Sequence, residues 1–325
     1  MKRIKTAWRA LACAIALTAA GAASAGYPDK PIKLIVPYAP AGTTDSVARF
    51  LAEGMGRELK QPIVIENRPG ASATVGTAIA ARAPADGYTL LFSSNANLVL
   101  SSLLYKNLSY DVRRDLEVIG VVAEVPSVIV VNAGFPANDL KQFAEWAKAN
   151  PNKTNYGSLG PGNTLYLASR MLETELGIQM TEVPYKGSSP GLAALLANDI
   201  QLMVDVTPSA IPLVKAGKLK ALAVPMESRL EQLPDVPTIA EAGYKPFHAS
   251  SWVGLSVPAN VPPDIVATLH AAMVKVAGSP QFRQTFHPIG LVQLPPKTKA
   301  ETEAYVEADR KRWGELVNRY KITLD

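Results

Sequence analysis

The sequence is poor in cysteine, with one residue, Cys13, in 325. That cysteine lies in an N-terminal segment with the order of a secretory signal peptide: basic residues up to Arg9, an apolar run over Ala10–Ala20, and the small residues Ala23-Ser24-Ala25. We predict cleavage after Ala25, so that residues 1–25 are the signal peptide and 325 − 25 = 300 residues remain. The remaining chain then has no disulfide, thiol nucleophile or cysteine metal site, and export without disulfides favours a periplasmic location.

An excess of one charge and long apolar runs are also missing. The signal peptide carries four basic residues, so the mature chain has 33 − 4 = 29 Lys and Arg against 28 Asp and Glu, a net charge of +1. No basic stretch alternates with aromatic residues, which argues against nucleic acid as a partner. No apolar run reaches the roughly 20 residues that span a bilayer, so a membrane anchor is not expected either.

Histidine is scarce as well. The three residues, His248, His270 and His287, are scattered, and the sequence has no Walker A, H-E-x-x-H or EF-hand pattern. Gly160–Leu165 reads G-x-G-x-x-L, which lacks the third glycine of a dinucleotide-binding loop. We therefore expect neither a metal nor a cofactor.

The mature chain shows a regular alternation of strands and helices. Apolar strands are predicted at Ile32–Val36, Ile63–Glu66 and Tyr88–Phe92, with helical patterns between them. This alternation predicts an α/β fold with parallel sheets and helices on both faces. The length suffices for two domains, and we expect the chain to cross between them near Glu124 and after a strand at Leu219–Val224. We predict that residues 26–124 plus 226–325 form domain 1 and residues 125–225 form domain 2.

Loops rich in small residues follow three of the predicted strands, at Pro40–Thr44, Tyr156–Thr164 and Tyr185–Pro190. Each loop precedes a predicted helix, and the first backbone N–H groups of a helix are available to bind an anion. Ligands in such folds lie at the carboxyl ends of the strands, where these loops fall. The three loops therefore predict an anion site.

The first of these loops leads into a helix predicted over Asp45–Leu59, because apolar residues recur every four positions from Val47 onward. Thr43 or Thr44 is expected to cap this helix. The carboxylate of Asp45 in the first turn suits the helix dipole.

One motif points to a different class of protein. Gly187–Gly191 matches G-x-S-x-G after a predicted strand and before a predicted helix, and Asp205 and the three histidines follow it in the order of a hydrolase triad. Pro190 has no backbone N–H to give to an oxyanion, so a helix start is the better explanation of the serines. A secreted serine hydrolase using Ser188 stays open as the alternative. Asp205 itself, at the end of an apolar strand, is either a loop cap or a hydrogen-bond acceptor in a pocket.

Several segments together carry a family resemblance over nearly the whole mature chain. They are Tyr27–Ile32, Glu66–Gly70, Ala85–Leu91, Tyr156–Ser158, Val183–Gly187, Lys215–Leu219 and Ser251–Gly254. In their order and spacing they resemble the Bug-type solute-binding proteins of tripartite tricarboxylate transporters. The resemblance implies an α/β, two-lobed periplasmic-binding-protein fold (Venus flytrap, type II-like) with the ligand cleft between the domains. It also implies a monomeric, non-enzymatic protein that reversibly captures a small carboxylate or related organic anion for the membrane permease subunits of a transporter, or for a sensor.

Carried over residue by residue, the resemblance assigns the ligand shell to loops of both domains. The assigned residues are Thr43, Thr44, Asp45, Ala73, Ser94, Ser158, Gly162, Asn163, Thr164, Tyr185, Lys186, Gly187 and Asp205. Some positions depart from the family pattern: Ala41, Thr43, Ser72 and Ala73 stand where glycine is usual, and Tyr166 where histidine is usual. We expect the four glycine replacements to line the cleft, and their loops either to use ordinary backbone angles or to carry strain.

Overall fold

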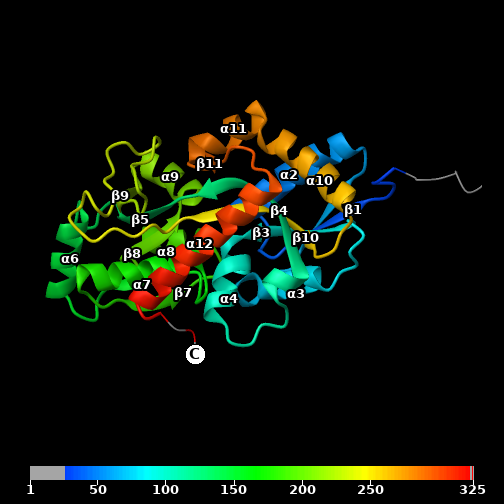
Figure 1. Cartoon of the computed structure of the whole chain (residues 1–325). Helices are drawn as coiled ribbons and strands as arrows, with labels where there is room; N and C mark the ends of the chain where they lie inside the picture. The colour runs from blue at the N-terminus through cyan, green and yellow to red at the C-terminus, as the bar shows by residue number, and fades with distance from the viewer. Residues whose placement is uncertain (1–25, 323, 325) are drawn as a thin grey trace, which may run out of the picture.

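The computed structural model describes residues 26–322 and 324 of the chain. The predicted signal peptide, residues 1–25, lies outside them. Figure 1 shows two groups of strands, each covered by helices, and helix α12 (Lys299–Arg319) running diagonally from one group toward the other. None of the helices in the described part combines the length and the apolar character that a membrane span requires.

The first sheet has six strands whose spatial order differs from their order in the chain. From edge to edge they are β11 (Val292–Gln293), β4 (Leu116–Val125), β10 (Ser251–Pro258), β3 (Thr89–Ser94), β1 (Ile32–Val36) and β2 (Ile63–Asn67). β1 is parallel to β2 and β3, as the alternation predicts, but β10 is antiparallel to both β3 and β4. The prediction of a parallel sheet is therefore wrong here, because β10 enters from the second sheet rather than through a helical crossover within the first.

The second sheet has five strands, in the order β7 (Thr181–Pro184), β6 (Asn155–Ser158), β8 (Leu202–Val206), β5 (Ser127–Asn132) and β9 (Leu219–Ala223). β6 is parallel to β7 and β8, whereas β5 is antiparallel to β8 and β9. This sheet is also mixed, because β5 enters directly from the first sheet. The first sheet with its helices is termed the first lobe, and the second sheet with its helices the second lobe.

Helices cover both faces of each sheet, as the sequence predicts. On the first lobe, α2 (Thr43–Leu59), α10 (Pro263–Ala277) and α11 (Pro280–Phe286) pack on one face, while α3 (Thr74–Ala81), α4 (Ser101–Leu104), α5 (Val112–Asp115) and α12 pack on the other. On the second lobe, α6 (Leu140–Ala149) and α7 (Thr164–Leu176) face α8 (Ser188–Leu196) and α9 (Thr207–Lys215) across the sheet. Three short helices complete the elements: the 3₁₀-helices η1 (Ala71–Ala73) and η3 (His287–Ile289) and the π-helix η2 (Ala96–Leu100). The alternation of apolar side chains along β1 shows this layering, because Leu34 faces α2 and Ile35 faces the opposite layer.

The chain crosses between the lobes at two places. β4 ends at Val125 and β5 begins at Ser127, so the first crossing lies close to its predicted position at Glu124. The return is less direct, because Leu230 and Leu233 still pack in the second lobe and the chain rejoins the first sheet only at Ser251. The domain boundary after residue 225 stays a prediction.

Helix α12 connects the lobes a third time. Its Arg310 donates to the carbonyl oxygen of Leu98 in the first lobe over 3.0 Å. Just beyond its last turn, the hydroxyl of Tyr320 donates to Glu175 on α7 of the second lobe over 2.6 Å. Motion between the lobes therefore has to bend or slide this helix as well as the two crossing segments.

Candidate functional site

A cavity of about 190 Å³ lies between the two lobes, and residues of both line it. It is termed the cleft cavity. Of the predicted ligand shell, it is lined by Thr43, Thr44, Ser94, Asn163, Thr164 and Gly187. Its volume is below the roughly 300–1,000 Å³ of sites for drug-sized ligands, so it suits a small solute.

The starts of four helices meet at the cleft cavity. The N-cap residues of α2, α7, α8 and α9 are Gly42, Asn163, Gly187 and Val206, and all four line it. No side chain caps α2 or α8, so their first N–H groups have no capping acceptor among the described residues. No described residue that lines the cavity carries a charge. Backbone N–H groups, hydroxyls and helix dipoles thus supply the positive potential in this cavity.

The first helix start differs from the prediction that Thr43 or Thr44 caps it. Gly42 is the N-cap residue, and both threonines are already helical, so their side chains are not in the position to accept from the second and third helical N–H groups. Both threonines instead line the cleft cavity.

Asp45 lies behind this helix start and does not line the cleft cavity. Its carboxylate accepts from the backbone N–H of Ala41 at 3.0 Å, from Arg49 Nε at 2.8 Å and from Asn67 Nδ2 at 2.8 Å. Burial raises the pKa of Asp45, but these hydrogen bonds outweigh burial and leave the pKa below its usual value. The ionised carboxylate therefore holds the loop before α2 in place.

Three of the four positions where glycine is usual adopt left-handed backbone angles. The φ values are 65° at Ala41, 50° at Ser72 and 74° at Ala73, whereas Thr43 is helical. Each such residue carries strain of about 1–2 kcal/mol because of its Cβ. The expected strain is thus present at three positions and absent at the fourth.

The four positions differ in whether they line a cavity of the cleft. Thr43 lines the cleft cavity, and Ala41 lines an adjoining cavity of about 480 Å³. Ser72 instead donates its hydroxyl across the cleft to the carbonyl oxygen of Pro161 at 2.6 Å. Ala73 is buried, and neither Ser72 nor Ala73 lines either cavity. Ala41 and Thr43 therefore line cavities of the cleft as expected, whereas Ser72 bridges the two lobes at the cleft and Ala73 is buried.

Two predicted residues shape the loop before α7 rather than line the cavity. The hydroxyl oxygen of Ser158, which is buried, accepts from the N–H of Gly160 at 2.9 Å. Gly162 has φ +82°, and a Cβ there would lie 2.8 Å from the hydroxyl oxygen of Tyr105 in the first lobe. Glycine at 162 therefore lets the two lobes approach each other at this loop.

The loop before α8 contributes to both cavities. Gly187 and Ser188 line the cleft cavity and the adjoining cavity, while the exposed Lys186 lines the adjoining cavity alone. Tyr185 packs on the apolar cluster of the second lobe. Asp205 is fully buried behind this loop, and its Oδ1 accepts from the hydroxyl of Ser188 at 2.6 Å.

Further residues of the site come from the crossing segments and from the loop after β1. Tyr38, Ser127, Ala249 and Ser251 line the cleft cavity, and none of them belongs to the predicted shell. Ser127 and Ser251 lie next to the crossings, where the pattern of apolar residues shows a buried strand but not which residue meets the cleft. Tyr38 was recognisable only as a residue near the carboxyl end of β1.

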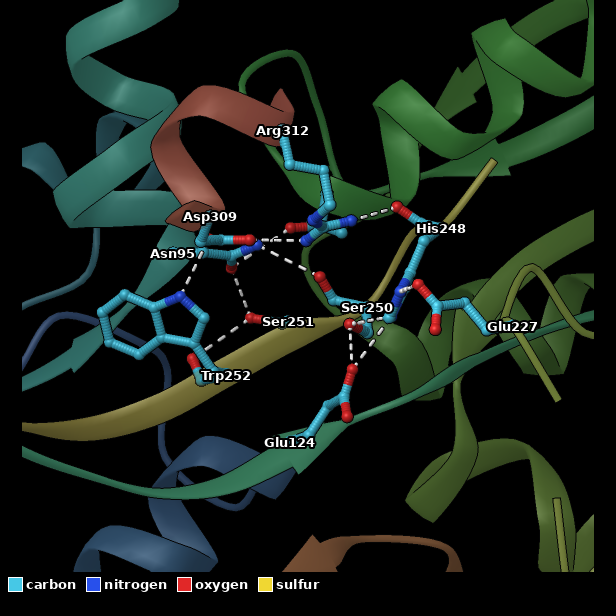
Figure 2. Close-up of polar contacts among 10 residues, drawn as sticks. Asn95, Glu124, Glu227, His248, Ser250, Ser251, Trp252, Asp309 and Arg312 are labelled. Atoms are coloured by element: carbon cyan, nitrogen blue, oxygen red, sulfur yellow. Dashed lines mark hydrogen bonds and ion pairs between the residues drawn. The ribbon is translucent and has the colours of Figure 1, made fainter. Parts of the chain in front are cut away.

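Figure 2 shows how the crossings are tied together. Asn95 Oδ1 accepts from the hydroxyl of Ser251 at 2.5 Å. The same oxygen also accepts from the hydroxyl of Thr164 on α7 at 3.4 Å. Below them, Glu124 at the end of β4 accepts from the ring of His248 at 2.9 Å and from the hydroxyl of Ser250. The two crossing segments are thus linked beside the cavity.

The arrangement excludes a serine–histidine pair at Ser188. Its hydroxyl bonds to Asp205, whereas His248 bonds to Glu124, His270 to a backbone carbonyl and His287 to Glu231. In the described residues no histidine is in place to take a proton from Ser188. The described part also contains no group of three or more side chains suited to hold a metal ion.

Comparisons with known proteins agree with this geometry. Residues 47–322 match the family described as the tripartite tricarboxylate transporter family receptor. The chain is 32% identical over 292 residues to the protein BugT of Bordetella pertussis, and the match covers 90% of this chain and 89% of that one. It is similar to the structure of periplasmic binding protein BugD, with 35% identity and a TM-score of 0.84 over 91% of this chain and 99% of that one. It is also similar to R. palustris Rpa4515 with adipate, with 30% identity and a TM-score of 0.86 over 92% and 99% of the two chains.

Proposed function

Because the chain belongs to the tripartite tricarboxylate transporter family of receptors, we propose that it captures a small carboxylate in the cleft cavity for uptake across the membrane. It is a solute-binding protein and not an enzyme. The observation that carries the proposal is the meeting of four helix starts at a cavity whose described lining residues are all uncharged. A carboxylate placed there accepts hydrogen bonds from backbone N–H groups and hydroxyls, which are stronger to an anion than to a neutral acceptor.

The partners and the location follow from the same proposal. The membrane permease subunits of a tripartite transporter receive the ligand, and the mature protein acts as a monomer in the periplasm after cleavage behind Ala25. The two lobes with linked crossing segments are the arrangement in which hinge closure traps a ligand. Release at the membrane then requires a partner that favours the open arrangement.

A thermal-shift screen of small organic acids tests the proposal. Adipate, with which the related R. palustris Rpa4515 was solved, heads a panel of straight-chain dicarboxylates and hydroxy acids. An acid present at about 100 times its dissociation constant stabilises the folded protein by about 2.7 kcal/mol, which raises the melting temperature by several degrees. Uncharged amides of the same acids are the control. A panel without any shift, or acids recovered chemically altered, would contradict the proposal.

The charge at position 186 gives a second test. Lys186 is exposed and lines the adjoining cavity, so Lys186→Ala is expected to weaken acid binding by less than about fivefold, the usual range for a solvent-exposed ion pair. Ser158→Ala removes the acceptor of the Gly160 N–H and disturbs the loop before α7. This variant is therefore expected to lose more of the free energy of acid binding than Lys186→Ala, about 1–3 kcal/mol. Calorimetric titration measures both, and the reverse ranking would indicate a salt-bridged site.

A further inference from the structure

The pair formed by Ser188 and Asp205 has an unusual environment for a carboxyl group. Asp205 is the penultimate residue of β8 and is 0% exposed. Its Oδ1 accepts from Ser188 at 2.6 Å, while its buried Oδ2 has no hydrogen-bond partner among the described residues. A buried carboxylate normally requires a cation or several donors, because desolvation of the charge is costly. The surroundings of Asp205 therefore favour the protonated, neutral acid.

The neighbouring elements supply no compensating charge. Along β8, Asp205 points to the same side as Met203, toward α8 and α9. Titratable side chains on the elements of this side stand before and after α8, at the end of α9, in the segment after β9 and in η3: Tyr185, Lys186, Asp199, Lys215, Glu227, Arg229, Glu231, Asp235 and His287. Helix α8 and the facing strand β5 have none, and none of the residues named forms a hydrogen bond or ion pair with Asp205 within the described part of the chain. Burial raises the pKa of Asp205 to about 7, against the opposing effects of Ser188 and the N–H of Val206.

The hydroxyl of Ser188 connects this acid to the cleft cavity, which Ser188 lines. A serine hydroxyl has one hydrogen to donate. When Asp205 is ionised, that hydrogen points to Oδ1, and Ser188 offers only lone pairs to the cavity. When Asp205 is protonated, the acid can donate to Ser188 Oγ, and the serine hydrogen is free to turn toward the cavity.

We propose that Asp205 acts through Ser188 as a positioning residue, so that capture of a carboxylate in the cleft cavity is coupled to uptake of one proton by Asp205. This inference rests on the proposed function and specifies the ionic form in which the site accepts its ligand. Only the protonated pair presents a hydrogen to a carboxylate oxygen, and only that form avoids a second negative charge beside it. Because linkage is reciprocal, acid binding raises the proton affinity of Asp205 by the factor by which the proton raises acid affinity.

The coupling predicts a particular pH profile. Above the pKa of Asp205 the free protein must first bind a proton, so the affinity for a fully ionised acid falls by up to about tenfold for each pH unit. Below that pKa the proton is already present and the affinity levels off. The fall in affinity with rising pH ends where the complex itself loses the proton.

Calorimetric titration with adipate, in buffers of different ionisation enthalpy, measures the protons taken up per ligand. We expect uptake to rise from near zero at about pH 6 toward one at about pH 9 in the wild type. Asp205→Asn should abolish the uptake and flatten the pH profile. Asp199→Asn, an acid-to-amide change at an exposed site of the same lobe, should leave both unchanged. Ser188→Ala keeps the carboxyl but removes the connecting hydroxyl, and it should lower the uptake to less than about half.

The outcomes separate this inference from the proposed function. Binding with uptake that disappears in Asp205→Asn supports the coupling. Should Asp205→Asn fail to fold, the pH profile of the wild type and the loss of uptake in Ser188→Ala decide in its place. Acid binding without proton uptake, or with proton uptake that Asp205→Asn and Ser188→Ala both retain, overturns the coupling and leaves the proposed function standing. If no acid of the panel binds, both are overturned.

Discussion

Gly254→Ala is expected to lower the free energy of unfolding by more than about 4 kcal/mol. Gly254 lies in β10, between β3 and β4 of the first sheet. A Cβ at this position would lie 2.1 Å from the carbonyl oxygen of Gly120 and 3.0 Å from the Cα of Val121. Both atoms belong to the backbone of the neighbouring strand, so the contact can be relieved only by parting the two strands. The register of β10 against β4 already shifts next to Gly254, which shows how closely the two strands approach there.

Gly120→Ala is the matched control for this prediction. Its Cβ would lie as close to a neighbour, 2.0 Å, but that neighbour is Cε of Met273, the end of a flexible side chain. Met273 can change rotamer, so the loss should be about 1–3 kcal/mol, as for an overpacked core. Urea unfolding of both variants, with the slope of each transition compared, measures the difference. Equal losses of unfolding free energy in the two variants would show that strand β4 can move away from β10 more easily than their close approach in the sheet indicates.

The periodic features of the sequence predicted the elements well. Ile32–Val36 and the following helix appear where the alternation placed them, because each buries a regular face against the other. The two-lobed fold implied by the resemblance is confirmed by the structures that this chain is similar to. The direction of β5 and β10 could not be predicted, because it depends on where the chain crosses between sheets and not on local pattern.

The sequence predicted which residues line the cleft cavity where that placement depends on local geometry. Asn163, Thr164 and Gly187 reach the cleft cavity because each stands at the start of a helix that follows a strand. Asp45 was predicted in the ligand shell but does not line the cavity. Its Oδ1 accepts a hydrogen bond from Asn67 of β2, and that contact exists only once the sheet has formed. Ser127 and Ser251 line the cleft cavity but were not predicted, because their positions depend on how the crossing segments pack.

Introducing a carboxylate at Thr164 should have the largest effect on ligand binding. Thr164 is the first residue of α7, is 4% exposed and lines the cleft cavity. Aspartate there would occupy the helix N–H groups that we assign to the ligand, and it would place a negative charge beside the bound acid. Two like charges about 4 Å apart interact by about 4 kcal/mol in a medium of effective dielectric constant near 20. Thr164→Asp is therefore expected to weaken acid binding by at least about 100-fold relative to Thr164→Asn.

The asparagine variant is the matched control because it has the same shape without the charge, and both variants lose the hydrogen bond from Thr164 to Asn95. An acidic side chain in the first turn of a helix is favoured by the dipole by about 0.3–1 kcal/mol, which opposes the cost of desolvating the carboxylate at this buried position, so the two variants should unfold at similar urea concentrations. A large difference in binding between two equally stable proteins then reports the charge in the cavity and not a loss of fold. Calorimetric titration with adipate makes the comparison. Equal affinities in the two variants would place the ligand carboxylate away from the start of α7, and the assignment of the anion site to the converging helix starts would be wrong.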